Sequence, residues 1–577
     1  MTWTPPTHAL TRAGAPIRTV RYVSASAPAI LLAVSAVAAV AYFFEFLRPA
    51  ADALDSVLPV DPADANPTVA ALSAIGLAAL TIGLLRGKSF AWWLAMATLS
   101  VSLLGQAQAL SHPLGVIVVG GLLAILLADR RRYFVETAVG WRRLIPALMV
   151  IGVVLVGLET SLVIATTGAW PGPLSALSDI TSAIGNALGL SDATANRVLA
   201  QTSRDALLGF LLLAARLPIV LAAIGVLSRV PEAPPDPTTR ARARVIAGKY
   251  GCGALLPFQL GEDKLVFSPP DSDGLVVYGL AGRTAVVLGD LIGSAEAAPS
   301  VFAEFLAQCR KLDRVPIVYQ ASSAGKATLL GAGFRTFKVG EEALIDLATF
   351  DTTGPRRANL RHTITRCRKD GVVFRWFPNG IPAEESALLD DLDAIDTAWR
   401  KKAGPEMGFT ISHFDRGALR WQAVSVAVSS AGRALAFTTF RKTGVDGGWV
   451  LDLMRRASDG PPGAVEACIA EAAVAFRTAG AKTLSLGLAP LGGLDTASSV
   501  LEERVLAHAG RLVHPWYDIA GLARFKNKFD PYWIPRFGAI HRRRDLIGFV
   551  IGLLRIHMSG AIHLPGRRRV ARQVAGA

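Results

Sequence analysis

The chain has 577 residues, of which 51% are hydrophobic and 18% are charged, and its formal net charge is +15. This apolar fraction is too high for an ordinary soluble protein. The positive balance favours anionic partners such as lipid headgroups or nucleic acid. The four cysteines lie far apart, with no C-x-x-C pair, so the sequence indicates neither a disulfide framework nor a zinc site.

Six apolar runs in the first half of the chain are candidates for helices that cross a bilayer, which takes about 20 residues. They are Ala27–Leu47, Val69–Leu85, Phe90–Leu110, Leu114–Ala128, Leu144–Thr166 and Ala206–Leu227. Basic residues gather in alternate connecting loops, which by the positive-inside rule places both termini in the cytoplasm. We therefore expect a cytoplasmic tail over 1–26, a multi-pass transmembrane region of the cell membrane over 27–229, and a Pro-rich linker over 230–245.

The rest of the chain has an α/β pattern in which a hairpin, a helix and a strand follow one another twice. In the first copy these are Gly274–Val277 with Ala285–Leu288, then Ala298–Lys311, then Val315–Tyr319. In the second copy they are Ala434–Arg441 with Gly448–Arg455, a helix from Pro462 to Thr478, and Thr483–Leu488. The repeat predicts two related units over 246–395 and 396–540. A basic amphipathic segment over 541–577 is expected to lie at a membrane interface.

Several sequence blocks resemble the aminoacyl-phosphatidylglycerol synthases, the multiple peptide resistance factor family. The blocks are Leu288-Gly-Asp290, Lys338-Val-Gly-Glu-Glu-Ala343, Leu451-Asp-Leu-Met-Arg455, Ser485-Leu-Gly-Leu-Ala-Pro-Leu491, and Gly521-Leu-Ala-Arg-Phe-Lys-Asn-Lys-Phe529 followed by Pro531, Trp533 and Pro535. They occur in the family's order over about half of the chain. The resemblance implies a phosphatidylglycerol lysyltransferase C-terminal domain, built as a tandem pair of GNAT-type acyltransferase units behind a helical transmembrane bundle.

The same resemblance implies an enzyme that transfers an amino acid, commonly lysine or alanine, from aminoacyl-tRNA to phosphatidylglycerol. The sequence contains no Walker loop, no H-E-x-x-H motif and no convincing Gly-rich acyl-CoA loop, so we expect no cofactor and no metal. The membrane part is shorter than in the largest relatives, which carry a flippase, so the acceptor could instead be a related lipid such as diacylglycerol. Coupling a cationic amino acid to an anionic lipid would lower the negative charge of the membrane surface. The chain could also form a homo-oligomer.

Asp452 and Arg455 are candidate catalytic residues at the end of a predicted strand. Their spacing of three needs a bend or bulge before both side chains can converge. Asp452 could bind the ammonium group of the donor or accept the hydroxyl proton. Arg455 could contact the tRNA terminus or the lipid phosphate, because its guanidinium fork suits either. The alternative is a structural ion pair at the strand end.

Further candidates are basic residues and one acidic residue. Lys526 and Lys528 alternate with aromatic residues, which in an extended segment would direct both ammonium groups to one side, where they could bind phosphate or an oxyanion. Glu342, next to Glu341, could supply an acid–base group or only end a strand. Substrate-binding residues are expected among the following arginines: Arg356, Arg357, Arg361, Arg368 and Arg524. Most of these lie in one basic stretch that could hold the tRNA acceptor stem, contact an anionic leaflet, or form a solvated helix.

Two other functions remain open on the sequence. The chain could be a lipid flippase or membrane scaffold with a non-catalytic GNAT-like domain. It could also be a transferase that uses the same tandem fold with another acceptor, such as a peptide or a cell-wall precursor.

Overall fold

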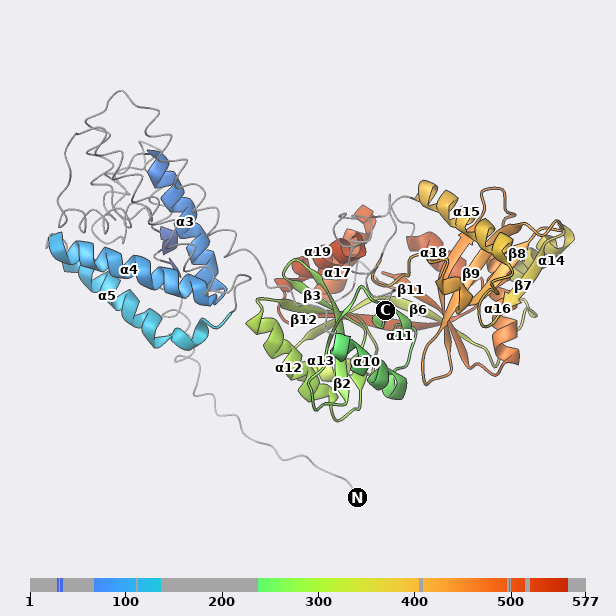
Figure 1. The fold of residues 1–577 in the computed structure, drawn as a ribbon, viewed down its shortest axis with the longest axis horizontal. Coiled ribbons are helices and arrows are strands. Elements are labelled where there is room, and N and C mark those ends of the chain that lie inside the picture. Colours follow the sequence, from blue (N-terminus) through green and yellow to red (C-terminus); the bar gives the residue numbers. More distant parts are fainter. Residues whose placement is uncertain are drawn as a thin grey trace, which may run out of the picture. The chain divides into compact units, whose positions relative to one another are not determined.

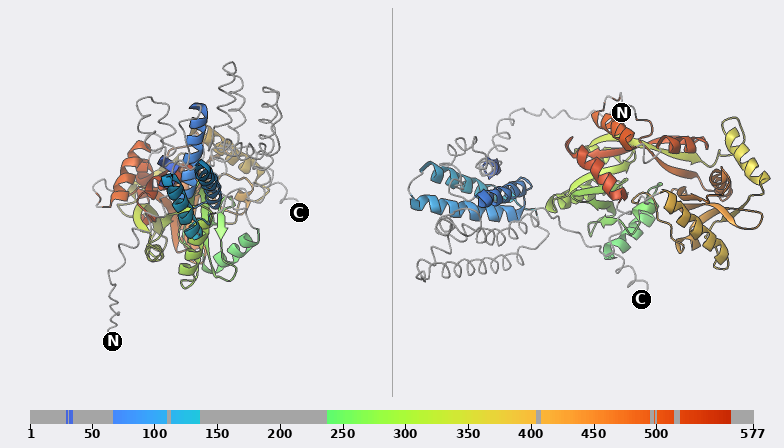
Figure 2. Two further views of the ribbon diagram at one scale, coloured as in Figure 1. Left: turned by 90° about the vertical axis from the view of Figure 1, so that its left-hand side faces the viewer. Right: turned by 90° about the horizontal axis from the view of Figure 1, so that it is seen from above.

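The computed structural model describes residues 29–30, 32–34, 67–109, 113–135, 237–403, 408–494, 498, 500–513 and 519–558. Two compact units divide the chain: residues 1–233 with 310–313, and residues 234–309 with 314–577 (Figures 1 and 2). The first unit corresponds to the predicted transmembrane region with its N-terminal tail. The second contains the predicted α/β repeat.

The described part of the first unit is helical, as the apolar runs predict. The helices are α3 (Pro67–Leu85), α4 (Ser89–Ala109) and α5 (Pro113–Ala128), followed by the short 3₁₀ helix η2 (Arg130–Arg132). Trp92 of α4 donates a hydrogen bond to the carbonyl of Leu126 on α5, at 2.8 Å. None of the described helices combines the length and the apolar character that crossing a bilayer takes. The predicted runs 144–166 and 206–227, and nearly all of 27–47, lie outside the described residues.

The second unit is built on one twelve-stranded sheet among its described residues. Along the sheet the order is β1-β2-β3-β5-β12-β6-β11-β10-β9-β8-β7, with β4 paired to β2. The strands of the first half are β1 (Leu265–Phe267), β2 (Gly274–Ala281), β3 (Thr284–Leu288), β4 (Ile292–Gly293), β5 (Val315–Ala321) and β6 (Arg335–Asp346). Those of the second half are β7 (Val373–Phe377), β8 (Ala423–Val428), β9 (Ala434–Lys442), β10 (Trp449–Arg456), β11 (Thr483–Pro490) and β12 (Tyr532–Ile540).

The two halves repeat one topology, which confirms the predicted tandem organisation. An antiparallel hairpin, β2–β3 or β9–β10, leads through a helix to a strand that pairs in parallel, β5 with β3 and β11 with β10. The connecting helices are α12 (Ala298–Lys311) and α16 (Ala464–Thr478). A parallel pair needs such a crossover because its strands start at the same edge.

The last strand of each half is exchanged. Strand β6, from the first half, pairs with β11 of the second half, whereas β12, from the second half, pairs with β5 of the first. The two exchanged strands also pair with each other, antiparallel, along most of their length. One continuous sheet therefore joins the halves, and no clean boundary exists at the predicted position between residues 395 and 396.

Helices cover both faces of the sheet. Figure 1 shows α12 and α13 (Lys326–Gly331) on one side of the first half's strands, with α17 (Leu501–Val513) and α19 (Asp545–Met558) on the other. Phe302 and Phe305 of α12 belong to one buried apolar cluster and Phe549 of α19 to another. In the second half, α16 and α14 (Ala358–Lys369) pack together on the sheet through Ile469 and Leu360.

The remaining helices correct two predicted boundaries. They are α10 (Pro237–Tyr250), α11 (Leu256–Gln259), α15 (Ser386–Ala403), η3 (Ala418–Arg420) and α18 (Ile519–Asn527). Helix α10 begins inside the predicted linker and packs against the first half through buried Ala243 and Ile246, so only the part before Pro237 can act as a linker. Helix α15 runs across residue 395, the predicted end of the first half.

Candidate functional site

The candidate site lies where the parallel strands β10 and β11 part. These strands pair only through Trp449 with Leu484 and Val450 with Ser485. Just beyond this point both strands have irregular registers, at Leu451/Met454 on β10 and at Ser485/Leu488 on β11. Bulges of this kind re-aim side chains and free backbone groups. Gly487 sits in the β11 irregularity with a φ of +77°, a conformation that disfavours a side chain.

Asp452 occupies the irregular part of β10. Its Oδ1 atom accepts a hydrogen bond from the backbone N–H of Ser412 at 3.3 Å. Its Oδ2 atom is buried and has no hydrogen-bond partner among the residues that the structure describes. Burial raises the pKa of this carboxyl above its ordinary value, although nearby Arg441 acts in the opposite direction. A buried carboxylate oxygen without a partner is costly, so a cationic or hydrogen-donating ligand would be bound favourably there.

Arg441, on the neighbouring strand β9, completes the surroundings of Asp452 and was not among the predicted site residues. Its Nη1 atom donates to the Ser412 hydroxyl at 3.2 Å, so both residues hold the same serine. The guanidinium lies 5.9 Å from the ring centroids of both Phe258 and Trp421. Aromatic neighbours orient a guanidinium while leaving its N–H groups available. The signal in the sequence was the predicted hairpin itself, which pairs Arg441 with Val450 near the start of β10, two residues before Asp452.

Lys526 is buried beside β11, on helix α18 rather than on the predicted extended segment. Its Nζ atom donates to the carbonyls of Gly487 at 3.0 Å and Leu488 at 2.7 Å, which lie at the irregularity in β11. Burial lowers the pKa of Lys526 to about 7, with Glu342 acting in the opposite direction. The lowered pKa makes this amine easier to deprotonate near neutral pH, as a proton-transfer group requires.

Lys528 does not share this position, so the prediction that both lysines face one way is wrong. The helix ends at Asn527, and Lys528 is half-exposed and pairs with Glu466 of α16 at 2.7 Å. In a strand, side chains two residues apart point to the same face. In a helix, with 3.6 residues per turn, they point in different directions.

Glu342 is buried on β6 and is held on both oxygens. Oε1 accepts a hydrogen bond from the Ser485 hydroxyl at 2.5 Å, and Oε2 accepts from Arg536 Nε at 2.7 Å. A second nitrogen of Arg536 also donates to Oε2. Ser485 belongs to the last β10–β11 pair, so Glu342 stabilises the strands at the point where they part. This arrangement fits a positioning residue better than an acid–base group. The neighbouring Glu341 pairs instead with Lys338, at 2.6 Å.

Arg455 forms a buried structural ion pair, the alternative to a catalytic role. The irregular register expected between Asp452 and Arg455 is present, but the Arg455 Nε atom donates to Asp396 of α15 at 2.9 Å. Its guanidinium carbon stacks 3.6 Å from the Trp399 ring centroid. Asp396 is fully buried and also pairs with Arg400 at 2.7 Å. The side chain of Arg455 therefore fixes α15 to the sheet.

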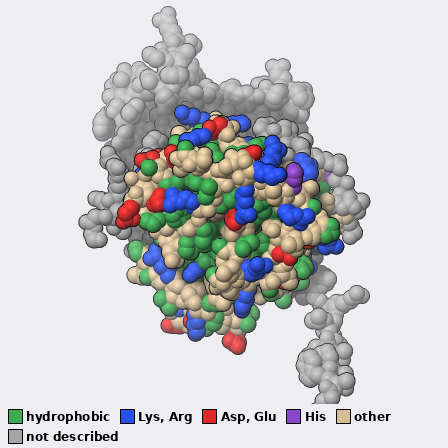
Figure 3. Space-filling view, turned by 90° about the vertical axis from the view of Figure 1, so that its right-hand side faces the viewer, with side chains coloured by type: hydrophobic (Ala, Val, Ile, Leu, Met, Phe, Trp, Pro, Cys, Tyr) green, Lys and Arg blue, Asp and Glu red, His purple; other side chains and the backbone are tan. Residues whose placement is uncertain are grey.

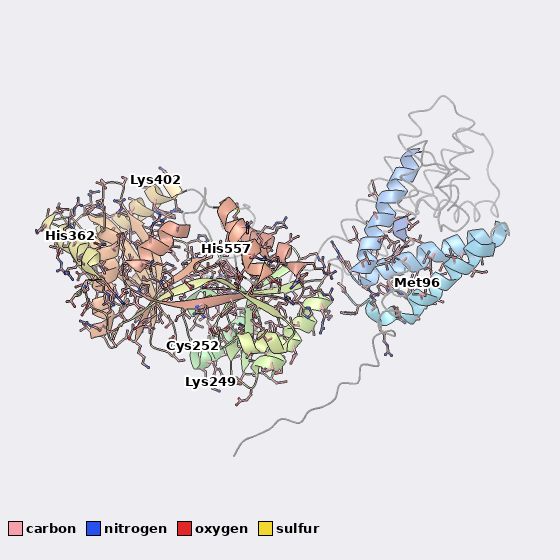
Figure 4. All side chains as sticks on the ribbon, turned by 180° about the vertical axis from the view of Figure 1, so that it is seen from behind. Met96, Lys249, Cys252, His362, Lys402 and His557 are labelled. Atoms are coloured by element: carbon pink, nitrogen blue, oxygen red, sulfur yellow. The ribbon has the colours of Figure 1, made fainter. Side chains whose placement is uncertain are left out.

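The predicted substrate-binding arginines lie mostly on or before α14, at the outer end of the second unit (Figure 1). His362 marks this helix in Figure 4, well away from Cys252 and His557. Their partners are acidic or carbonyl groups: Asp530 for Arg356, Asp351 and Asp530 for Arg357, the carbonyls of Thr352 and Gly354 for Arg361, and Glu471 for Arg368. Arg524 lies on α18, two residues before Lys526. Figure 3, which looks onto this end, shows Lys and Arg side chains scattered among hydrophobic and uncharged ones.

The described residues contain no group of three or more His, Cys, Asp or Glu side chains arranged to hold a metal ion. Among the four cysteines, Cys252 is exposed and the other three are buried.

Comparison with known proteins gives consistent matches over the α/β domain. Residues 255–540 match the family model described as phosphatidylglycerol lysyltransferase, C-terminal. A phosphatidylglycerol lysyltransferase of Bacillus subtilis (strain 168) is 31% identical over 290 residues, which is 50% of this chain and 33% of that protein. The lysylphosphatidylglycerol biosynthesis bifunctional protein LysX of Gordonia bronchialis is 25% identical over 552 residues, 88% of this chain and 46% of that protein.

A solved structure, that of L-PGS from Bacillus licheniformis, is 28% identical with a TM-score of 0.49 and covers 56% of this chain and 96% of that one. The chain spans a third to a half of the length of these two curated relatives. The family resemblance of the sequence blocks is confirmed by the match over 255–540.

Proposed function

Because residues 255–540 belong to the phosphatidylglycerol lysyltransferase C-terminal family, we propose that the chain is an aminoacyl-tRNA-dependent lipid aminoacyltransferase. It moves a lysyl or alanyl group from aminoacyl-tRNA to phosphatidylglycerol or a related lipid such as diacylglycerol. The observation that carries the proposal is Asp452, whose buried Oδ2 atom has no partner in the described structure at the point where β10 and β11 part.

The reaction is an ester exchange. A hydroxyl oxygen of the lipid attacks the carbonyl carbon of the aminoacyl ester, the bond to the tRNA ribose oxygen breaks, and the hydroxyl proton passes to that oxygen. Because the ester is already activated, the protein has to align the two substrates, move one proton and stabilise the oxyanion.

The residues at the parted strands can supply these functions. Asp452 binds the ammonium group of the amino acid through its Oδ2 atom, and an ammonium placed there restores the charged form of the carboxylate. Arg441 holds the lipid phosphate beside it. Lys526 transfers the proton: as a neutral amine it keeps both N–H bonds to the Gly487 and Leu488 carbonyls and still has its lone pair.

The test is a transfer assay with the full chain, tRNA charged with lysine or alanine, and phosphatidylglycerol vesicles, with the lipid product identified by mass spectrometry. Asp452→Asn keeps the shape and removes the charge. We expect the rate to fall about a hundredfold, within the 2–5 kcal/mol typical of a lost buried charge partner. The control is Asp459→Asn, just beyond the end of β10, which removes an exposed carboxylate paired with Arg433 at 2.6 Å.

Two results would contradict the proposal. If neither amino acid gives an aminoacylated lipid with phosphatidylglycerol or diacylglycerol, the transferase assignment fails, and lipid translocation becomes the function to measure. If Asp452→Asn retains the full rate, Asp452 has no part in the chemistry.

We also propose that the α/β domain faces the cytoplasm, where charged tRNA is found. Cys252, the exposed one of the four cysteines, provides the probe. A membrane-impermeant maleimide should label it in inside-out vesicles but not in intact cells. Equal labelling of intact cells would place the domain outside and exclude a tRNA donor.

A further inference from the structure

Helix α19 has one face built into the domain and one face left open. On the inner face, Leu546, Phe549 and Ile556 are buried in the apolar cluster that covers β3 and β5. On the outer face, four large apolar side chains are 44–70% exposed: Ile547, Ile551, Leu554 and Met558. Their spacing of four, three and four residues aligns them along one side of the helix. We call these four residues the outer stripe.

Positive charge borders the outer stripe. The exposed residues Arg542, Arg543 and Arg544 precede the helix, and Arg555 lies in its last turn. Two acidic groups lie near them: Glu502 pairs with Arg543 at 3.7 Å, and Asp545 accepts a hydrogen bond from the Arg542 backbone. An apolar stripe bordered by arginines is the composition of a helix that lies in the headgroup region of an anionic bilayer.

The inner face of α19 reaches the segment that holds Asp452. His557 accepts a hydrogen bond from the Gly408 N–H through its backbone carbonyl, at 2.9 Å. Its Nε2 atom lies 3.3 Å from the Thr410 hydroxyl, and its ring makes an edge contact with Phe409. Ser412, two residues further on, donates to Asp452. Phe409 has a φ of +70°, which is uncommon for a residue with a bulky side chain, so the contacts around it have to hold the segment in place.

We propose that α19 docks the α/β domain onto an anionic phospholipid bilayer through its outer stripe. The docked helix then holds residues 408–412, and with them Asp452, at the surface from which the acceptor lipid comes. Only the positioning of Asp452 toward the acceptor lipid rests on the proposed transferase function. Docking itself is a property of the surface and can be measured without any catalysis.

The first experiment measures docking in the full chain reconstituted into vesicles. An environment-sensitive fluorophore is attached to Ile551→Cys in a Cys252→Ser background, with Leu330→Cys as the control. Leu330 is 52% exposed, comparable to Ile551 at 44%, but lies on α13. We expect a blue shift and quenching by quencher-labelled lipid at position 551 only, stronger in phosphatidylglycerol than in phosphatidylcholine vesicles. Equal, water-like emission at both positions would overturn the proposal.

Another occupant of the outer stripe would give a different signal. If a second copy of the chain covers α19, the blue shift at position 551 appears in detergent without vesicles and increases with protein concentration. That outcome would also overturn bilayer docking.

The second experiment measures transfer by two variants. The test variant carries Ile547→Ser, Ile551→Ser and Leu554→Ser. The matched control carries Val245→Ser, Leu330→Ser and Val373→Ser, which are 52–73% exposed on other elements. We expect the test variant to lose about tenfold in rate on vesicles, because three aliphatic side chains no longer bury their surface in the bilayer. Its rate on detergent-dispersed short-chain phosphatidylglycerol should match that of the control.

The outcomes separate the two proposals. Equal losses on vesicles and on dispersed lipid would mean that the serines disturb the fold rather than docking, and would count against this inference. A lipid-dependent shift at position 551 without product from any variant would support docking and reject the transferase. Product formation without a shift at position 551 would support the transferase and reject docking through α19.

Discussion

The lowered pKa of Lys526 makes the stability of the domain depend on pH in a predictable direction. In the unfolded chain a lysine holds its proton up to its ordinary pKa of 10.5, whereas folded Lys526 loses it at about 7. Between these values the unfolded state binds one proton more, so the free energy of unfolding rises with pH. Each pH unit well inside this range contributes about 1.4 kcal/mol. The full effect is about 5 kcal/mol, and the part between pH 7 and pH 9 is about 2 kcal/mol.

The perturbation that isolates this effect is Lys526→Met, which keeps the chain length and removes the titrating group. The variant also loses the hydrogen bonds to the Gly487 and Leu488 carbonyls, a cost that does not change with pH. We therefore expect the stability of the wild type relative to the variant to increase by about 2 kcal/mol from pH 7 to pH 9. In melting temperature this corresponds to a relative shift of roughly 4 °C.

The assay follows tryptophan fluorescence on heating for both proteins at several pH values, with Lys528→Met as the control for the loss of a lysine. The transfer rate of the wild type should also rise as the pH increases through about 7, as expected for a base of that pKa. A difference between wild type and Lys526→Met that stays constant from pH 7 to pH 9 would refute the reasoning. Lys526 would then keep its charge and could not act as the base.

Three further substitutions separate structural from chemical roles. Arg455→Met leaves buried Asp396 with Arg400 as its remaining partner, so the midpoint of denaturation should fall, by less than the equivalent of the about 3–5 kcal/mol that a fully unpaired buried charge costs; unchanged stability would contradict the ion pair between Arg455 and Asp396. Lys528→Ala breaks a half-exposed pair worth about 1 kcal/mol or less and should leave the transfer rate unchanged, so a large loss of rate would place Lys528 in the chemistry. Glu342→Gln leaves the partly buried Arg536 without a counter-charge, and both the denaturation midpoint and the transfer rate should fall; a lower rate at unchanged stability would instead indicate acid–base catalysis by Glu342.

The sequence predicted the elements whose signals are local. The hairpins, the crossover helices and the parallel strands of both halves lie within a few residues of their expected bounds, because apolar periodicity and glycine-containing turns encode them directly. Helix α12 has the predicted bounds Ala298–Lys311. Asp452 and Lys526 were identified from the family blocks, and both lie where β10 and β11 part.

What the sequence did not predict depends on contacts between distant residues. Nothing local in β6 or β12 specifies that these strands exchange partners, and the pairing of Arg455 with Asp396 joins residues 59 positions apart. The helical state of α18 did have a signal: Phe525, in the helix, and Phe529, two residues past its end at Asn527, are four residues apart, and their ring centroids lie 5.8 Å from each other. Because the spacing was interpreted as strand alternation, Lys528 was predicted to face the same way as Lys526, which is wrong.

The exchange of β6 and β12 limits how the domain can be cut into fragments or encoded by separate genes. In each half of the sheet, one strand position is occupied by a strand from the other half of the sequence. A fragment that ends before β12 would leave unpaired edges on both β5 and β6, and exposed edges of this kind promote aggregation. Although the two halves repeat one topology, neither is an independent module, and a gene split between them could act only if both fragments were made together and reassembled.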